Sequence, residues 1–252
     1  IILEGISPKP VYLFIDDQKV ELRDASEYWG KGSITVERMF KEQLGEEFQV
    51  AVIGPGGENL VSYASINHDY GREAGRGGVG AVMGSKRLKA IVLHGTQSVQ
   101  VADLAGYRKA GMALFKACKD SDGLKPWQDY GTTIVTSWCD EVGALPTRNF
   151  SAGSFEGGPT LYGPVMREQI VITDKGCFGC PSPCGKYSRM KRYGSTVEGP
   201  EYETIGMLGS NLGIADIQDV AQANLLCDEL GIDTISAGSA IGWAMECFEK
   251  GI

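Results

Sequence analysis

The sequence predicts an α+β protein in which a β-rich part is followed by a mainly helical part. Short runs of β-branched and aromatic residues dominate the first hundred positions, and helical apolar spacing replaces them after Val101. Because 42% of the 252 residues are hydrophobic, the chain can bury a sizeable core and is not disordered. We place the boundary near residue 100, which gives parts of residues 1–100 and 101–252.

The first part contains several predicted strands and one helix. Two apolar runs flank the polar turn at residues 16–19, a pattern typical of a β-hairpin. An irregular apolar stripe predicts a helix over residues 33–44. The predicted strands cover residues 11–15, 20–23, 50–53 and 88–93.

The second part contains three predicted helices. Asp103 caps a helix that runs through Cys118, and Asp216 precedes a helix that ends at Gly231. A last helix covers about residues 234–250. We expect these apolar side chains of the first and last helices to pack against other elements: Leu104, Tyr107, Met112, Leu114, Phe115, Ile241, Met245 and Phe248. Residues 120–175 are turn-rich and carry no clear pattern.

Composition excludes several classes of protein. The net charge of −8 and the pI near 4.9 argue against a surface for nucleic acid or anionic membrane, because phosphate binding needs a clustered positive field. No apolar run is long enough to span a bilayer, and there is no signal peptide. Seven cysteines in a chain of this length are not a disulfide scaffold, so we expect a reducing cytoplasm. The chain opens without Met and closes within a helical run, which predicts an internal piece of a longer protein.

Three cysteines stand within eight residues, in a Gly/Pro-rich loop. Cys177, Cys180 and Cys184 form a C-x2-C-x3-C pattern, and no second C-x2-C or H-x3-H follows to complete a structural zinc site. Iron–sulfur clusters are held by thiolates at such short spacings, often with the last cysteine distant in sequence. The spacing favours a cluster over zinc, and zinc over a disulfide.

A glycine-rich segment at residues 74–86 precedes the predicted strand at 88–93. Backbone without side chains there can approach an anion and present N–H groups to it. The segment is not a Walker loop, and it lacks the strand-before, helix-after context of a dinucleotide fingerprint. The alternative is a tight turn packed against a sheet.

Two acidic segments lie closer to the C-terminus. Asp233 and Thr234 can cap the last helix and free backbone amides for an anionic or heterocyclic ligand, with ordinary capping as the alternative. Residues 198–204 carry three carboxylates, and a buried one would become a usable acid or base. A solvated acidic turn is the alternative there.

These four segments, in this order, resemble the tungsten-dependent aldehyde ferredoxin oxidoreductase family. The resembling residues are 75–91, the cysteine loop, 199–204 and 227–234. The resemblance implies that residues 1–100 finish a β-rich base domain that carries pterins. Residues 101–252 would then open the first of two helical domains, with the second supplied beyond Ile252.

The resemblance also implies the cofactors. Tungsten, or molybdenum, would lie between two pyranopterins beside a [4Fe–4S] cluster. Cys177, Cys180 and Cys184 match three cluster ligands, and the family's fourth lies far toward the C-terminus. The Ala74 carbonyl would bind the Mg²⁺ that joins the pterin phosphates. The remaining residues matched to pterin binding are Gly75, Arg76, Gly77, Gly78, Asp228, Gly231, Ile232, Asp233 and Thr234.

The implied activity is the oxidation of an aldehyde to a carboxylic acid, with electrons passed through the cluster to ferredoxin or an electron-transfer subunit. Glu203 matches the family's active-site glutamate and is the expected base, and Glu201 is the second choice. We hypothesise that a basic island steers the electron carrier, with a solvated loop as the alternative. The island consists of Lys186, Arg189, Lys191 and Arg192.

The sequence departs from the family at one point and leaves other functions open. Gln222 and Leu225 replace an E-x2-H motif that binds iron at a homodimer interface in some members, so we expect no iron there and leave a homo- or hetero-oligomer open. The other functions are a benzoyl-CoA-reductase-like tungstoenzyme, a non-enzymatic iron–sulfur electron-transfer subunit and a zinc-binding structural domain. His68 and His94 have no expected catalytic role.

Overall fold

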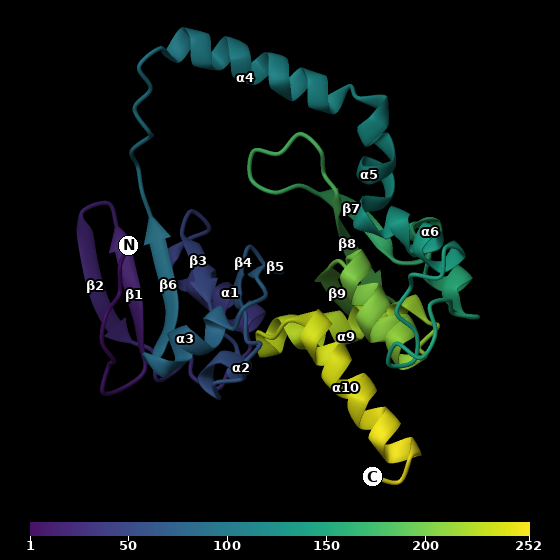
Figure 1. The fold of residues 1–252 in the computed structure, drawn as a ribbon. Helices are drawn as coiled ribbons and strands as arrows, with labels where there is room; N and C mark the ends of the chain where they lie inside the picture. The colour runs from purple at the N-terminus through teal and green to yellow at the C-terminus, as the bar shows by residue number, and fades with distance from the viewer. The chain divides into compact units, whose positions relative to one another are not determined.

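The computed structural model describes residues 1–252 and divides them into two compact units (Figure 1). The first unit contains residues 1–97 and 225–237. The second contains residues 98–224 and 238–252. The segment 225–237 therefore belongs with the β-rich unit, although it lies more than a hundred residues further along the chain.

The first unit is built on a six-stranded sheet with the order β2-β1-β6-β3-β4-β5. Strand β1 pairs in parallel with β6, and every other pairing is antiparallel. The predicted hairpin is confirmed, with Val11 opposite Asp24 and Asp16 opposite Lys19. The strands are β1 (Val11–Asp16), β2 (Lys19–Asp24), β3 (Gln49–Val52), β4 (Ile66–His68), β5 (Arg72–Ala74) and β6 (Leu88–His94).

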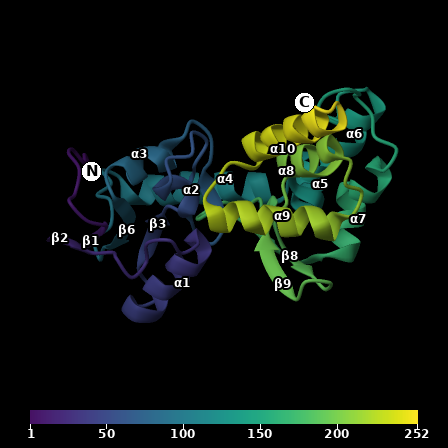
Figure 2. The ribbon, with the colours of Figure 1, turned by 90° about the horizontal axis from the view of Figure 1, so that it is seen from below.

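Helices cover both faces of this sheet, which explains why β1 is a continuous apolar run. Successive side chains of a strand point to opposite faces. Tyr12 and Phe14 pack in the cluster that contains Phe40 of α1 (Ser33–Leu44), and Val11 and Leu13 pack with Met83. Figure 2 shows α1 and α3 on opposite sides of the strands. The predicted helix at residues 33–44 is confirmed.

The glycine-rich segment is not a turn before a strand. It follows β5 and opens the helix α3 (Val79–Ser85), which packs against α2 (Pro55–Glu58). A Cβ on Gly84 would lie 1.9 Å from the Gly57 carbonyl oxygen, and one on Gly80 would lie 2.2 Å from that of Ser65. These glycines allow α3 to pack closely against α2 and against the Ser65 backbone. The glycine-rich sequence did not by itself indicate this packing role.

The second unit contains a three-stranded antiparallel sheet, β7-β8-β9, among short helices. The helix α4 begins after Asp103, whose carboxylate accepts a hydrogen bond from the Gly106 amide, as predicted. Helices α9 and α10 each pass from one unit into the other along the chain.

The helices and strands that follow residue 98 along the chain are α4 (Leu104–Lys119), η1 (Asp122–Leu124), α5 (Lys125–Tyr130), η2 (Gly131–Ile134), α6 (Val135–Glu141), η3 (Gly158–Leu161), α7 (Gly163–Gln169), β7 (Val171–Lys175), β8 (Gly185–Met190), β9 (Ser195–Glu198), α8 (Tyr202–Thr204), the π-helix η4 (Ile205–Gly209), η5 (Ser210–Leu212), α9 (Ile217–Leu230) and α10 (Thr234–Glu249).

The expected packing of the first and last helices is wrong. Helix α4 has no buried residue, and Phe115 is exposed. In α10, Ile241, Met245 and Phe248 are exposed as well. Apolar periodicity identifies the face that a helix is able to bury, but it does not supply the element that covers it. None of the helices combines the length and apolar character needed to cross a membrane.

A buried ion pair connects α2 to β6 in the first unit. Lys89 Nζ lies 2.5 Å from Glu58 Oε1, and the two side chains are 0% and 4% exposed. Lys89 Nζ also donates to the Lys31 carbonyl, while Glu58 Oε2 accepts from the Gly30 amide. Each charge thus has a partner and a backbone hydrogen bond.

We predict that Lys89→Met lowers the free energy of unfolding by about 3–5 kcal/mol, because Glu58 would keep an unpaired buried charge. Urea denaturation measures the effect. The surface pair of Lys9 and Asp24 provides the control, since Lys9→Met is expected to cost less than about 1 kcal/mol. An equal loss in the two variants would contradict the assigned role of the buried pair.

Candidate cofactor site

The glycine-rich loop of the first unit has the context expected of a ligand-binding turn. Ala74 ends β5, and α3 begins at Val79. Gly77 and Gly78 have φ angles of 93° and 72°, in the left-handed region that favours glycine. A Cβ on Gly78 would also lie 2.4 Å from the Ser62 carbonyl oxygen. Both backbone conformation and space therefore require glycine at position 78.

The acidic loop at residues 228–234 joins the end of α9 to the start of α10. Gly231 has a φ of 65°, and the Ile232 amide donates to the Cys227 carbonyl. The Asp233 carboxylate accepts from the amides of Ile235 and Ser236, at 3.2 and 2.9 Å. Ordinary capping by Asp233 is thus confirmed, and it fixes the loop that the resemblance matches to a pterin.

The stretch Tyr63 to Asn67 holds these two loops together. The Tyr63 carbonyl accepts from the Asp233 amide at 3.0 Å, and the Ser65 amide donates to the Gly231 carbonyl at 2.9 Å. The Ala64 carbonyl accepts from the Gly80 amide at 3.0 Å, next to the glycine-rich loop.

An ion pair links the two loops directly. Arg76 Nη1 lies 3.2 Å from Asp233 Oδ2. The Arg76 side chain is 61% exposed, whereas that of Asp233 is 7% exposed. All the residues matched to pterin and magnesium binding therefore lie in the first unit, on two loops that meet.

Two further titratable groups lie at this junction. Glu73 carried no sequence-based prediction, and Cys227 lies in the matched segment 227–234 without a predicted role. Burial raises the pKa of the Glu73 carboxyl to about 7, and the nearby Asp233 carboxylate adds to the shift. Burial also raises the pKa of the Cys227 thiol to about 12, with Asp228, Glu73 and Asp233 contributing negative charge. The available signal was the position of Glu73 next to Ala74, in the strand that enters the glycine-rich loop.

The residues of the first unit fit a pterin by one unsatisfied polar atom. Asn67 Oδ1 is buried and has no hydrogen-bond partner, although buried polar atoms are normally paired. Asn67 belongs to the stretch that touches the two loops. A pterin is a flat heterocycle that carries N–H donors and oxygen and nitrogen acceptors at its edges, so it offers the N–H donor that this oxygen atom needs.

The cysteine loop lies between β7 and β8 in the second unit. Cys177 and Cys180 are exposed, Cys184 is half-buried, and none of the chain's seven cysteines forms a disulfide. The Cys180 amide donates to the Cys177 carbonyl at 3.0 Å, which makes a tight turn. No group of three or more His, Cys, Asp or Glu side chains is arranged to hold a metal ion. The donors have the right chemistry for a cluster, but the three thiols do not converge in this structure.

The two candidate bases lie in the second unit and differ in their surroundings. The Thr132 hydroxyl donates to the Glu201 carboxylate, and the same oxygen atom, Thr132 Oγ1, accepts from the Tyr202 amide at 2.9 Å. Glu203 stands in the short helix α8, and its side chain is exposed. The buried carboxylate of this segment is Glu198, 2.9 Å from Lys175 Nζ.

Only part of the basic island is the exposed cationic surface that we expected, because Arg189, Lys191 and Arg192 are exposed but Lys186 is not. Lys186 is buried and donates to the Gln128 carbonyl at 2.6 Å, and its Nζ lies 3.0 Å from Asp174. Arg192 pairs with two carboxylates of the α9 region. The sequence showed four cations close together but not the acidic partners, which are distant along the chain.

Together, the two sheets and the helices around them define an α+β protein, with two paired loops in its first unit. Its family follows from comparison with known sequences: the chain belongs to the aldehyde ferredoxin oxidoreductase family. The model of the family's N-terminal domain matches residues 1–95, and the model of domains 2 and 3 matches residues 109–252.

Relatives and a solved structure agree with this membership. Tungsten-containing aldehyde ferredoxin oxidoreductases of Pyrococcus horikoshii and Pyrococcus furiosus are 44% and 43% identical to the whole chain. An aliphatic sulfonate oxidoreductase, WOR-like subunit, of Pyrococcus furiosus is 32% identical. The chain spans 42–43% of the length of these proteins. A similar solved structure is the active site complex BamBC of benzoyl coenzyme A reductase in complex with 1,5-dienoyl-CoA. The match has a TM-score of 0.81 and 28% sequence identity, and it covers 98% of this chain and 39% of the BamBC chain.

We predict that Glu73 makes the chain less stable as the pH rises. Between the usual carboxyl pKa of 4.5 and about 7, the unfolded chain has lost the proton that folded Glu73 keeps. Unfolding therefore releases a proton, and stability falls by about 3 kcal/mol from pH 5 to pH 8. Glu73→Gln is expected to remove this part of the slope in urea titrations of the EDTA-treated chain. An unchanged slope would show that Glu73 ionises normally.

Proposed function

We propose that this chain belongs to a tungsten-dependent oxidoreductase that oxidises aldehydes to carboxylic acids. The observation that carries the proposal is the meeting of residues 75–78 with residues 228–234, joined by the ion pair of Arg76 with Asp233. Membership of the aldehyde ferredoxin oxidoreductase family supports the same function. We also propose a domain boundary near residue 100 and a cytoplasmic location.

The paired loops would hold the cofactor. When bound, a tungsten or molybdenum bis-pyranopterin supplies a metal that takes two electrons from the aldehyde carbon. The Ala74 carbonyl would bind Mg²⁺ at the pterin phosphates, and Arg76 would offset phosphate charge. The carboxylates of Asp228 and Asp233 are hydrogen-bond acceptors, so they would accept hydrogen bonds from the N–H groups of a pterin.

The chain's own acid–base groups would manage the protons. Oxidation of an aldehyde consumes one water and releases two protons and two electrons. Glu203 would accept a proton from that water, because it matches the family's active-site glutamate and its carboxylate is exposed. Glu201 is held by Thr132 and is therefore the second choice.

The electron acceptor is proposed to be ferredoxin or an electron-transfer subunit. We propose that Cys177, Cys180 and Cys184 give three thiolates to a [4Fe–4S] cluster. The exposure of Cys177 and Cys180 leaves them free to turn toward a common centre. Because the three thiols do not converge in this structure, we assign the cluster on the chemistry of its donors alone.

A benzoyl-CoA-reductase-like reaction is the second candidate function. The structural match to the BamBC complex favours it, with a TM-score of 0.81 over 98% of the chain. The paired loops would hold the cofactor in either reaction, since both reactions need the same type of cofactor. The two candidate functions differ in their substrate.

The test is metal analysis of the anaerobically purified protein together with aldehyde-dependent viologen reduction. We expect tungsten or molybdenum with iron, and Glu203→Gln is expected to lower kcat by about 10²–10⁴ without changing the metal content. Glu141→Gln, at an exposed glutamate of α6, is the matched control.

Several outcomes would contradict the proposal. Iron without tungsten or molybdenum would favour an electron-transfer subunit, and stoichiometric zinc alone would favour a structural domain. Reduction of an aromatic thioester without aldehyde oxidation would favour the second candidate.

A further inference from the structure

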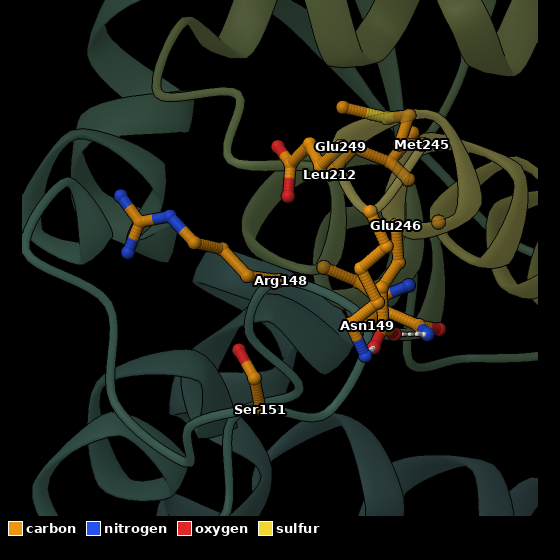
Figure 3. Close-up of a pocket in the computed structure, with 10 residues that line it drawn as sticks. Arg148, Asn149, Ser151, Leu212, Met245, Glu246 and Glu249 are labelled. Atoms are coloured by element: carbon orange, nitrogen blue, oxygen red, sulfur yellow. Dashed lines mark hydrogen bonds and ion pairs between the residues drawn. The ribbon is translucent and has the colours of Figure 1, made fainter. Parts of the chain in front are cut away.

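The second unit contains a cavity that the proposed function does not use. It has a volume of about 390 Å³ and lies between α10 and the loop of residues 148–151. Gly242, Met245, Glu246 and Glu249 line it at the i, i+3, i+4, i+7 spacing of one helix face. Figure 3 shows the Glu249 carboxylate and the Ser151 hydroxyl pointing into this space.

The loop that forms the opposite wall is held in an uncommon conformation. Arg148, Asn149 and Phe150 have φ angles of 45°, 51° and 61°, three successive non-glycine residues in the left-handed region. Such conformations persist where the surroundings fix them, and they cluster at ligand sites.

Backbone hydrogen bonds fix this loop to the segment at η5. The Arg148 amide donates to the Ser210 carbonyl at 3.1 Å, and the Asn149 amide donates to that of Asn211 at 3.0 Å. Asn211 is 1% exposed, and its side-chain oxygen accepts from the Phe150 amide. A Cβ on Gly242 would lie 2.9 Å from Asn211 Nδ2, so glycine keeps the helix close. The cavity is therefore built by specific contacts.

The charges around the cavity leave one carboxylate available. Arg148 is bound by Glu156, with Nη1 to Oε2 at 3.0 Å. Glu246 is bound by Lys250 and by Asn149 Nδ2. Glu249 has neither a hydrogen bond nor an ion pair, although its charge acts on Arg148 across the space. Of the charged residues that line the cavity, Arg148 and Lys250 are thus paired with Glu156 and Glu246, and the Glu249 carboxylate is left without an ion pair.

The remaining uncommitted groups also accept hydrogen bonds. The Ser151 hydroxyl and Asn149 Oδ1 have no partner, while Asn149 Nδ2 is already used by Glu246. Leu212 and Met245 add an apolar wall. An anionic ligand would have to displace Glu156 from Arg148. A cationic ligand can bind the unpaired acceptors of Glu249, Ser151 and Asn149 without displacing any group.

We propose that this cavity binds a small aliphatic amine in its ammonium form. The Glu249 carboxylate, the Ser151 hydroxyl and Asn149 Oδ1 receive its three N–H groups, and Leu212 and Met245 contact its alkyl chain. The site is independent of the paired loops of the first unit and of the proposed oxidation.

The probe is n-butylammonium chloride, titrated into the full chain labelled with ¹³C at the methionine methyl groups. Met245 is one of seven methionines, and Met245→Leu assigns its signal. We expect a saturable shift of the Met245 methyl with half-saturation at about 1–10 mM, the affinity typical of so small a ligand. Butyrate and butanol, matched in length, are expected to leave it unmoved.

Two variants test the chemistry of the site. Glu249→Gln is expected to raise the dissociation constant at least fivefold, and Ser151→Ala about twofold. Glu168→Gln, at an exposed glutamate of α7, is the matched control and is expected to leave it unchanged.

Three results would overturn the proposal. They are a motionless Met245 signal, an equal response to butanol or butyrate, and equal affinity in the Glu249 and Glu168 variants. A capped tripeptide with a central lysine that binds tenfold more tightly than butylammonium would also overturn it, because the site would then receive a protein side chain.

Discussion

The candidate cofactor site depends on the contact that holds residues 225–237 against the β-rich unit. A Cβ on Gly54 would lie 2.4 Å from the Leu230 carbonyl group, and one on Gly231 would lie 2.6 Å from the Gly54 amide nitrogen. The two backbones therefore touch directly, with no space for a side chain. Because the Tyr63–Asn67 stretch binds both the glycine-rich and the acidic loop, this contact decides whether the two loops lie next to each other.

The electrostatics of the site follow from that close contact. Asp228, Glu73 and Asp233 concentrate negative charge around the buried Cys227 thiol, and the exposed Arg76 pairs with Asp233. Burial with like charge favours protonated forms, so Glu73 and Cys227 keep their protons at higher pH than usual. Glu73, with a pKa of about 7, can thus exchange a proton near neutral pH without a histidine.

The sequence predicted the elements of this fold better than their packing. Hairpin, strands and capped helices follow from local patterns, and residues 11–24 and Asp103 behave as those patterns require. Local sequence patterns do not indicate which distant residues come into contact. The ion pair between the buried Lys186 and Asp174, and the absence of buried residues in α4, depend on which elements pack together in the folded chain.

The candidate site shows the same division. Residue chemistry singled out the glycine-rich and acidic loops, and their order carried the family resemblance. The structure brings the two loops together through Arg76 and Asp233. The pKa shifts of Glu73 and Cys227 were missed because burial, which causes them, arises from tertiary packing. The cysteine spacing indicated thiolate ligands, but spacing does not fix where three side chains point.

The most direct test of this account is hydrogen exchange in Gly54→Ala. Gly54 has a φ of −86°, so alanine is compatible with its backbone and only the contact with Leu230 is disturbed. Gly95→Ala is the control, because its nearest neighbour would be 3.9 Å away. We predict that the amides of Ser65 and Asp233 exchange at least tenfold faster in Gly54→Ala than in Gly95→Ala. Equal protection in the two variants would contradict the claim that this contact holds the site together.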